Sequence, residues 1–259
     1  MGSKGSTRHS KRLSAPVTYG IKRKHGVFTI RPYPTRGPFD ISIPLGIIVR
    51  ERLGYAKTLN EVKKVLHNRF MKIDGKIRTN YKHSLGLMDV LEITKTKEFY
   101  RLVPFKGKRR ITLHTITEEE AKKKLLQVKK KHSTKGGLIQ FTFHDGTSKV
   151  INPAEEYSIK FSEVSPKDTV LYNIETGEYE EHYPFAEGNM SIIVGGHSVG
   201  LLGKLTEIET QIGRKKRTVT IQLEEGEFKT TDNHIFIVGK EKAMVSLPQP
   251  EGVLEENES

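Results

Sequence analysis

The clearest pattern of apolar and polar positions lies between residues 43 and 93 and predicts two helices followed by a small antiparallel sheet. Pro44 suits the first turn of a helix, where its missing N–H costs nothing, and Gly54 is placed to end that helix. The second helix carries one apolar stripe, formed by Leu59, Val62, Val65, Leu66 and Phe70. Its opposite side is polar and basic, so we expect it to face solvent or a partner.

Local signals fix the ends of these elements. Thr58 and Glu61 have the spacing of a capping box, in which each side chain binds the other residue's backbone N–H. Asp74-Gly75 is a two-residue hairpin signal between two short strands. The alternation from Leu87 to Ile93 then predicts the strand that closes the module.

The next stretch, 94–116, is rich in strand signals and contains a basic turn, Phe105–Arg110. Thr117–Glu120 predicts the start of a helix, because carboxylates in the first turn complement the helix dipole. The lysines of 122–124 and 129–131 follow, and we expect them toward the end of that helix.

From residue 138 to 185 short strands predict a small barrel or curled sheet. One hairpin turns at Asp145-Gly146, and a second pair of strands covers Val170–Ile174 and Tyr179–Phe185. A last β module runs from Met190 to about Val238. Its first two strands flank a turn that contains Gly195, Gly196, Gly200 and Gly203.

Charge is distributed very unevenly along the 259 residues. The net charge is +13, but residues 1–150 hold 34 Lys and Arg against 11 Asp and Glu, whereas residues 151–259 hold 10 against 20. Such asymmetry indicates one half that faces a polyanion, and nucleic acid is the commonest one. An anionic membrane is the alternative, but no basic helix with a large apolar face is evident.

The first 39 residues contain no Asp or Glu and little apolar periodicity. We expect this segment to lack fixed structure until it lies on a partner, with Val27–Ile30 as a short strand within it. It is either a solvated tail or, as we favour, an arm that contacts phosphates through Lys4, Arg8, Lys11 and Arg12.

Several function classes find no support in the sequence. The chain has no Cys, which excludes disulfides and Cys-based zinc sites, and none of its 10 His residues has HExxH spacing. The glycine-rich turn fails the P-loop pattern at both ends, since Ser198 stands at the first glycine position and Leu205 follows Lys204. No GxSxG motif occurs. We expect no secretory signal, no membrane span, no enzyme activity, no cofactor and no small-molecule substrate.

Four phrases give the chain a specific resemblance. RFMKIDGKIRT followed by GLMDVLEI resembles the S-four RNA-binding domain, or alpha-L fold. Together with HSKRLSAP near the N-terminus and TITEEEAKKKL later, they resemble the archaeal and eukaryotic small-subunit ribosomal protein S-four, e-type family. The glycine-rich turn is similar to the KOW motif of SH3-like barrels, although Lys204 stands where an aliphatic residue is expected.

The resemblance implies an α+β multidomain protein. Its expected segments are a disordered basic arm (1–42), an alpha-L module (43–93), a β-rich, barrel-like central domain with one helix (94–186), a KOW barrel (187–245) and an acidic tail (246–259). The implied function is that of a structural constituent of the small ribosomal subunit. Its implied partners are small-subunit ribosomal RNA and neighbouring ribosomal proteins. The implied location is the cytoplasmic ribosome, with nucleolar assembly if the source is eukaryotic.

Motif position and charge select the candidate RNA contacts. They are Lys4, Arg8, Lys11, Arg12, Arg50, Arg52, Lys57, Lys63, Lys64, Arg69, Lys72, Lys76, Arg78, Gly195, Gly196 and His197. Two alternatives stay open, namely a KOW-containing assembly or elongation factor that binds RNA transiently and an RNA-modifying enzyme. The enzyme needs a further catalytic domain, which the segments after residue 93 do not resemble.

Overall fold

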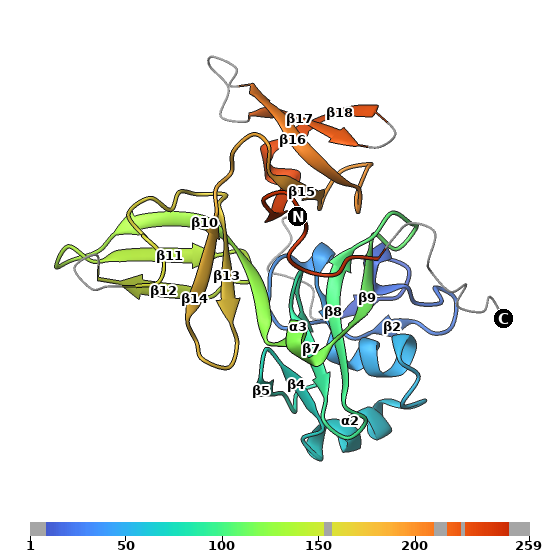
Figure 1. Cartoon of the computed structure of the whole chain (residues 1–259). Coiled ribbons are helices and arrows are strands. Elements are labelled where there is room, and N and C mark those ends of the chain that lie inside the picture. Colours follow the sequence, from blue (N-terminus) through green and yellow to red (C-terminus); the bar gives the residue numbers. More distant parts are fainter. Residues whose placement is uncertain (1–8, 153–156, 210–216, 224–225, 249–259) are drawn as a thin grey trace, which may run out of the picture. The chain divides into compact units, whose positions relative to one another are not determined.

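The structure is a computed structural model that describes residues 9–152, 157–209, 217–223 and 226–248. The chain forms two compact units, residues 1–102 and 103–259 (Figure 1). Strand β8 (Glu98–Pro104) carries the chain from the first unit into the second. The finer division into five segments stays a prediction.

The N-terminal segment is folded from residue 9 onward, so the expectation of an arm without fixed structure is wrong for the part that the structure describes. β1 (Ser10–Lys11) pairs with β2 (Phe28–Thr29). A 3-10 turn, η1 (Val17–Tyr19), lies between these strands, and a second, η2 (Phe39–Ile41), follows β2. The segment buries four apolar side chains, Ala15, Tyr19, Ile21 and Ile30. Their spacing has no helix or strand period, which is why the pattern does not reveal them.

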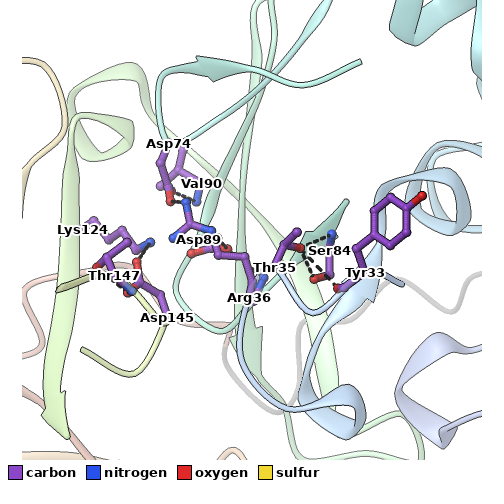
Figure 2. Close-up of polar contacts among 11 residues, drawn as sticks. Tyr33, Thr35, Arg36, Asp74, Ser84, Asp89, Val90, Lys124, Asp145 and Thr147 are labelled. Atoms are coloured by element: carbon purple, nitrogen blue, oxygen red, sulfur yellow. Dashed lines mark hydrogen bonds and ion pairs between the residues drawn. The ribbon is translucent and has the colours of Figure 1, made fainter. Parts of the chain in front are cut away.

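A buried ion pair holds the end of this segment on the rest of the first unit. Arg36 donates to Asp74 at 2.8 Å and lies 3.7 Å from a carboxylate oxygen of Asp89 (Figure 2). The side chain of Arg36 is 8% exposed and that of Asp89 is fully buried. Asp89 also accepts from the N–H of Gly86, and Asp74 accepts from that of Val90. The segment is therefore tied to the turn and the strand that form the adjacent sheet.

The first helix is shorter than predicted, and its second part is a π-helix, which is wider than an α-helix. β3 (Ile43–Pro44) pairs with β6 (Ser84–Leu85), and α1 (Leu45–Ile47) passes directly into a π-helical turn, η3 (Ile48–Arg52). The Leu53 N–H bonds to the Ile48 carbonyl, five residues back. Gly54 follows with a φ of +70°, as expected of the residue that ends a helix.

The second helix and its hairpin are confirmed. α2 (Leu59–His67) begins at a complete capping box between Thr58 and Glu61. β4 (Met71–Ile73) and β5 (Lys76–Ile77) flank Asp74 and Gly75, whose φ values of +48° and +72° suit a type I′ turn. β7 (Val90–Ile93) starts later than predicted, because a tight turn joins Gly86 to Asp89. In the first unit the strand order is β5-β4-β7-β8.

The predicted long helix after Thr117 is wrong. α3 (Glu118–Ala121) makes a single turn, and the lysine-rich sequence continues as the strand β10 (Lys123–Ser133). This strand is central in a sheet of order β12-β11-β10-β13-β14, so both of its edges are hydrogen-bonded. Strand pairing on both edges outweighs the helix propensity of Lys and Leu.

The other strands of the central sheet lie where the alternation predicts them. They are β11 (Ile139–Phe143), β12 (Ser148–Ile151), β13 (Thr169–Asn173) and β14 (Tyr179–Tyr183). The core beneath them contains Leu126, Val128, Phe141, Phe161 and Val170. Lys124 and Asp145 form a buried ion pair at 3.0 Å. Burial alone would raise the pKa of Asp145, but the Lys124 charge and the Thr147 hydrogen bonds outweigh it and hold that pKa below its usual range.

The last module is a five-stranded antiparallel sheet, within the β module that the sequence predicts. Its strands are β15 (Met190–Ile193), β16 (Leu202–Glu209), β17 (Thr218–Leu223), β18 (Gly226–Thr231) and β19 (Ile235–Gly239), and a 3-10 turn, η4 (Asp232–His234), precedes the last of them. The order is β18-β17-β16-β15-β19. Among the described residues no helix is both long and apolar enough to cross a membrane.

The capping box gives a direct test of the first unit. Replacing Thr58 by Ala should lower the free energy of unfolding by about 1 kcal/mol, because the third N–H of α2 loses its acceptor. The exposed Thr79, which caps no helix, is the control, and Thr79→Ala should change stability by less than about 0.5 kcal/mol. Urea unfolding followed by circular dichroism measures both. Equal losses in the two variants would mean that the cap does not stabilise α2.

Candidate nucleic-acid interface

The outer face of α2 is basic and forms a shallow surface depression. Lys63, Lys64, His67 and Asn68 line it. The opposite face of the helix packs Val62 and Leu66 into the core. The amphipathic pattern therefore does two things at once, since the apolar stripe fixes the helix while two exposed ammonium groups remain on the surface.

A row of alternating lysines and tyrosines adjoins this face. The Lys63 ammonium lies 5.5 Å from the centre of the Tyr81 ring. Lys82 lies 5.3 Å from the ring centre of Tyr33 and 5.8 Å from that of Tyr81. The Tyr33 N–H also bonds to the Lys82 carbonyl, which joins the N-terminal segment to the loop before β6. Cations interleaved with partly exposed aromatic rings are typical of surfaces that bind RNA strands.

Some predicted contact residues are exposed and some are not. Six of them are exposed on the first unit, namely Lys11, Lys57, Lys63, Lys64, Arg69 and Lys76, and Arg78 is half-buried. Lys63 and Lys64 lie together on α2, and Arg69 follows that helix with a φ of +61°. Lys4 and Arg8 lie outside the described residues.

Four other predicted residues are engaged within the protein. Arg12 is 4% exposed, donates to the Lys22 carbonyl and pairs with Glu51 at 3.2 Å. Arg50 pairs with the same carboxylate at 3.0 Å, and Lys72 pairs with Glu92 at 2.8 Å. Arg52 donates to the Thr18 carbonyl. We correct the role of Arg12, because its guanidinium holds the N-terminal segment and is not presented to a partner. Its partner Glu51 is 39 residues away in the sequence, so local spacing does not reveal the ion pair.

The glycine-rich turn presents its backbone on the second unit. A Cβ at Gly195 would meet the His234 ring at 2.1 Å, so a side chain there would require that ring to shift. Gly196 has a φ of +88°, and nothing lies within 4 Å of where its Cβ would be. Gly196 and His197 are both exposed. This turn is therefore accessible, as the sequence predicts.

Tyr33, Tyr81 and Lys82 are not among the contacts that motif position and charge predict. The signal for them is the interleaving of aromatic and basic residues in Tyr81-Lys82-His83, which becomes meaningful once Tyr33 lies beside it. The basic turn Phe105–Arg110 is also outside the predicted contacts. Three of its side chains, Lys106, Lys108 and Arg110, are exposed.

Comparison with known proteins gives a consistent result. Residues 4–38 match the model of the RS4NT domain, and residues 96–179 match the model of ribosomal family S4e. The chain is 36% identical over 247 residues to small ribosomal subunit protein eS4 of Ignicoccus hospitalis, covering 95% of this chain and 96% of the relative. It is 37% identical to the protein of that name from Ixodes scapularis, covering 97% of this chain and 93% of the relative.

A solved structure is also similar. The crystal structure of 30S ribosomal protein S4e from Thermoplasma acidophilum superposes with a TM-score of 0.64 at 28% identity. The match covers 78% of this chain and 96% of the other.

A buried histidine lies beside the ion pair of Arg36. His83 is 9% exposed, and its Nε2 atom has no hydrogen-bond partner among the described residues. Burial lowers the pKa of His83 to about 4, and the charges of Arg78 and Arg36 act in the same direction. The folded protein therefore holds this ring neutral at neutral pH.

This burial predicts a pH dependence of stability. An unfolded histidine titrates near pH 6.5, so between about pH 6.5 and 4 the unfolded chain binds a proton that the folded chain does not. Stability should fall as the pH drops through that range, and His83→Gln should remove that part of the loss. His67→Gln, at an exposed position on α2, should leave it unchanged. Urea titrations from pH 7 to 4 test this, and identical curves for wild type and His83→Gln would contradict it.

Proposed function

This chain belongs to the small ribosomal subunit protein eS4 family, and we propose that it is a structural constituent of the small ribosomal subunit that binds ribosomal RNA. The observation that carries the RNA-binding proposal is the exposed basic face of α2 beside the row Lys63–Tyr81–Lys82–Tyr33. The family is named for a structural component of the ribosome, which argues against an enzyme. Its proposed place in the cell is the ribosome.

The proposal includes a modular architecture. We assign residues 43–93 to an alpha-L module, supported by two short helices followed by the hairpin at Asp74-Gly75. We assign 187–245 to a KOW-type SH3-like barrel, supported by five antiparallel strands with a glycine-rich turn between the first two. These modules present short basic turns and one helix face.

Binding would work by charge and shape. The lysines on α2 neutralise phosphates, and the release of counterions from the RNA supplies much of the affinity. Recognition of RNA depends on the shape of its helices and on stacking with unpaired bases, and the exposed Tyr33 ring supplies a stacking surface. The side chains of Arg12, Arg50 and Lys72, which are ion-paired within the protein, keep these surfaces in position. Neighbouring ribosomal proteins are the further partners that we propose.

Charge reversal on α2 tests the interface. The double variant Lys64→Glu/Arg69→Glu should weaken binding to small-subunit ribosomal RNA at least tenfold. It should also reduce the slope of log K against log salt by about 1.4 to 1.8, because two phosphate contacts are lost. Filter binding between about 0.05 and 0.2 M salt measures both quantities.

The matched control reverses two exposed lysines that are paired with carboxylates. Lys160 pairs with Glu163 and Lys229 pairs with Glu209, so Lys160→Glu/Lys229→Glu should leave RNA binding within about twofold of wild type. Equal losses in both double variants would mean that α2 is not the contact. Loss of the protein from small subunits after a high-salt wash and sedimentation would indicate a transient factor.

A further inference from the structure

Two turns of the second unit lie directly against each other. One is the glycine-rich turn between β15 and β16, and the other is the basic turn 105–110 that precedes β9 (Ile111–Ile116). A Cβ at Gly200 would lie 2.3 Å from the backbone nitrogen of Lys106 and 2.4 Å from the carbonyl carbon of Phe105. Both neighbours are main-chain atoms, so neither can move aside as a flexible side chain could. The close approach of the two turns therefore requires glycine at position 200.

Each turn is also closed by its own hydrogen bonds. Gly200 donates to the Ile193 carbonyl at 2.8 Å. Phe105 donates to the Arg110 carbonyl at 2.9 Å, and Arg110 donates to that of Gly107 at 3.0 Å. Both turns are thus ordered before any partner binds, which reduces the entropy lost on binding.

The charged side chains of the basic turn are all positive. Lys106, Lys108 and Arg110 are exposed, and Arg109 is half-buried. The sequence from Phe99 to Thr117 contains no Asp or Glu. The other turn adds the exposed backbone of Gly196 and the exposed imidazole of His197. Cations beside accessible glycine backbone suit a sugar–phosphate chain, because glycine lets the strand approach the protein closely.

We infer that these two turns form one composite binding site for the sugar–phosphate backbone of RNA, with Lys108 and Arg110 on one side and Gly196 and His197 on the other. This inference rests on the proposed function and specifies it further. About ninety residues lie between the two turns in the sequence, and the turns are in contact at Gly200.

Footprinting on RNA tests the composite site. The full chain is bound to the small-subunit ribosomal RNA of its source, and protection from hydroxyl radicals is mapped for wild type, Lys108→Gln/Arg110→Gln and His197→Ala. Both variants should lose protection at the same short group of nucleotides and keep the remaining footprint. The Lys108→Gln/Arg110→Gln variant should bind about tenfold more weakly, with a slope of log K against log salt smaller by about 1.4.

Glycine substitutions test the connection between the turns. Gly200→Ala should weaken RNA binding at least as much as Lys108→Gln/Arg110→Gln does. Adding Gly200→Ala to that double variant should lower the RNA affinity by less than a further factor of two. Gly136→Ala is the matched control, because Gly136 has a similar positive φ in the same unit but nothing lies within 4 Å of its Cβ position. Its RNA affinity should equal that of wild type. A second control, Lys160→Gln/Lys229→Gln, removes two carboxylate-paired lysines and should also bind normally.

The outcomes separate this inference from the proposed function. A wild-type protein that does not bind the RNA contradicts the proposed function itself. Normal RNA binding with unchanged footprints in Lys108→Gln/Arg110→Gln and His197→Ala contradicts only the composite site. Loss of protection at two separate RNA regions, with multiplicative effects on affinity, also overturns it, because the turns would then bind independently. The footprints remain informative even if Gly200→Ala does not fold.

Discussion

The buried ion pair of Arg36 with Asp74 and Asp89 is the constraint on which the first unit depends. Three charges lie in a region where water is largely excluded, and each is compensated by a partner or by a backbone N–H. Removing one partner of such an arrangement costs ~3–5 kcal/mol, because the others stay buried and uncompensated. The pair connects three separate pieces of the chain, namely the N-terminal segment, the hairpin turn and the start of β7.

That connection also positions the proposed RNA surface. Tyr33 and Thr35 precede Arg36. The Tyr33 N–H bonds to the Lys82 carbonyl in the loop before β6. The Thr35 hydroxyl bonds to Ser84 at the start of that strand (Figure 2). The tyrosine–lysine row exists only while this segment stays in place. Basic residues in this chain therefore have two roles. Buried ones such as Arg12 and Arg36 hold the N-terminal segment, whereas exposed ones on α2 face solvent and are available to phosphates.

Local chemistry made much of the fold predictable. The capping box, the Asp74-Gly75 turn and the strands on either side of Asp145-Gly146 depend on neighbouring residues, and they lie where the sequence predicts. The failures have a common cause in long-range pairing. The lysines after Ala121 form a strand because β11 and β13 pair with it on either side, and the N-terminal segment folds because Glu51, Asp74 and Asp89 accept its arginines. Neither the strand partners nor the carboxylate partners can be inferred from the spacing of residues in the sequence. For the same reason motif position and charge predict the α2 lysines as contacts but not Tyr33, because Lys82, which lies beside its ring, is almost fifty positions away in the sequence.

Hydrogen exchange of an Arg36→Met variant tests whether the Arg36 ion pair holds the N-terminal segment in place. Exchange should become faster at the amides of Tyr33 and Ser84, whose hydrogen-bond acceptors are Lys82 and Thr35, while amides inside α2 stay protected. RNA affinity should fall with that local opening. Lys24→Met, an exposed change in the same segment, should alter neither. Unchanged protection at Tyr33 and Ser84 in Arg36→Met, together with unchanged RNA affinity, would mean that the ion pair does not hold this segment in place.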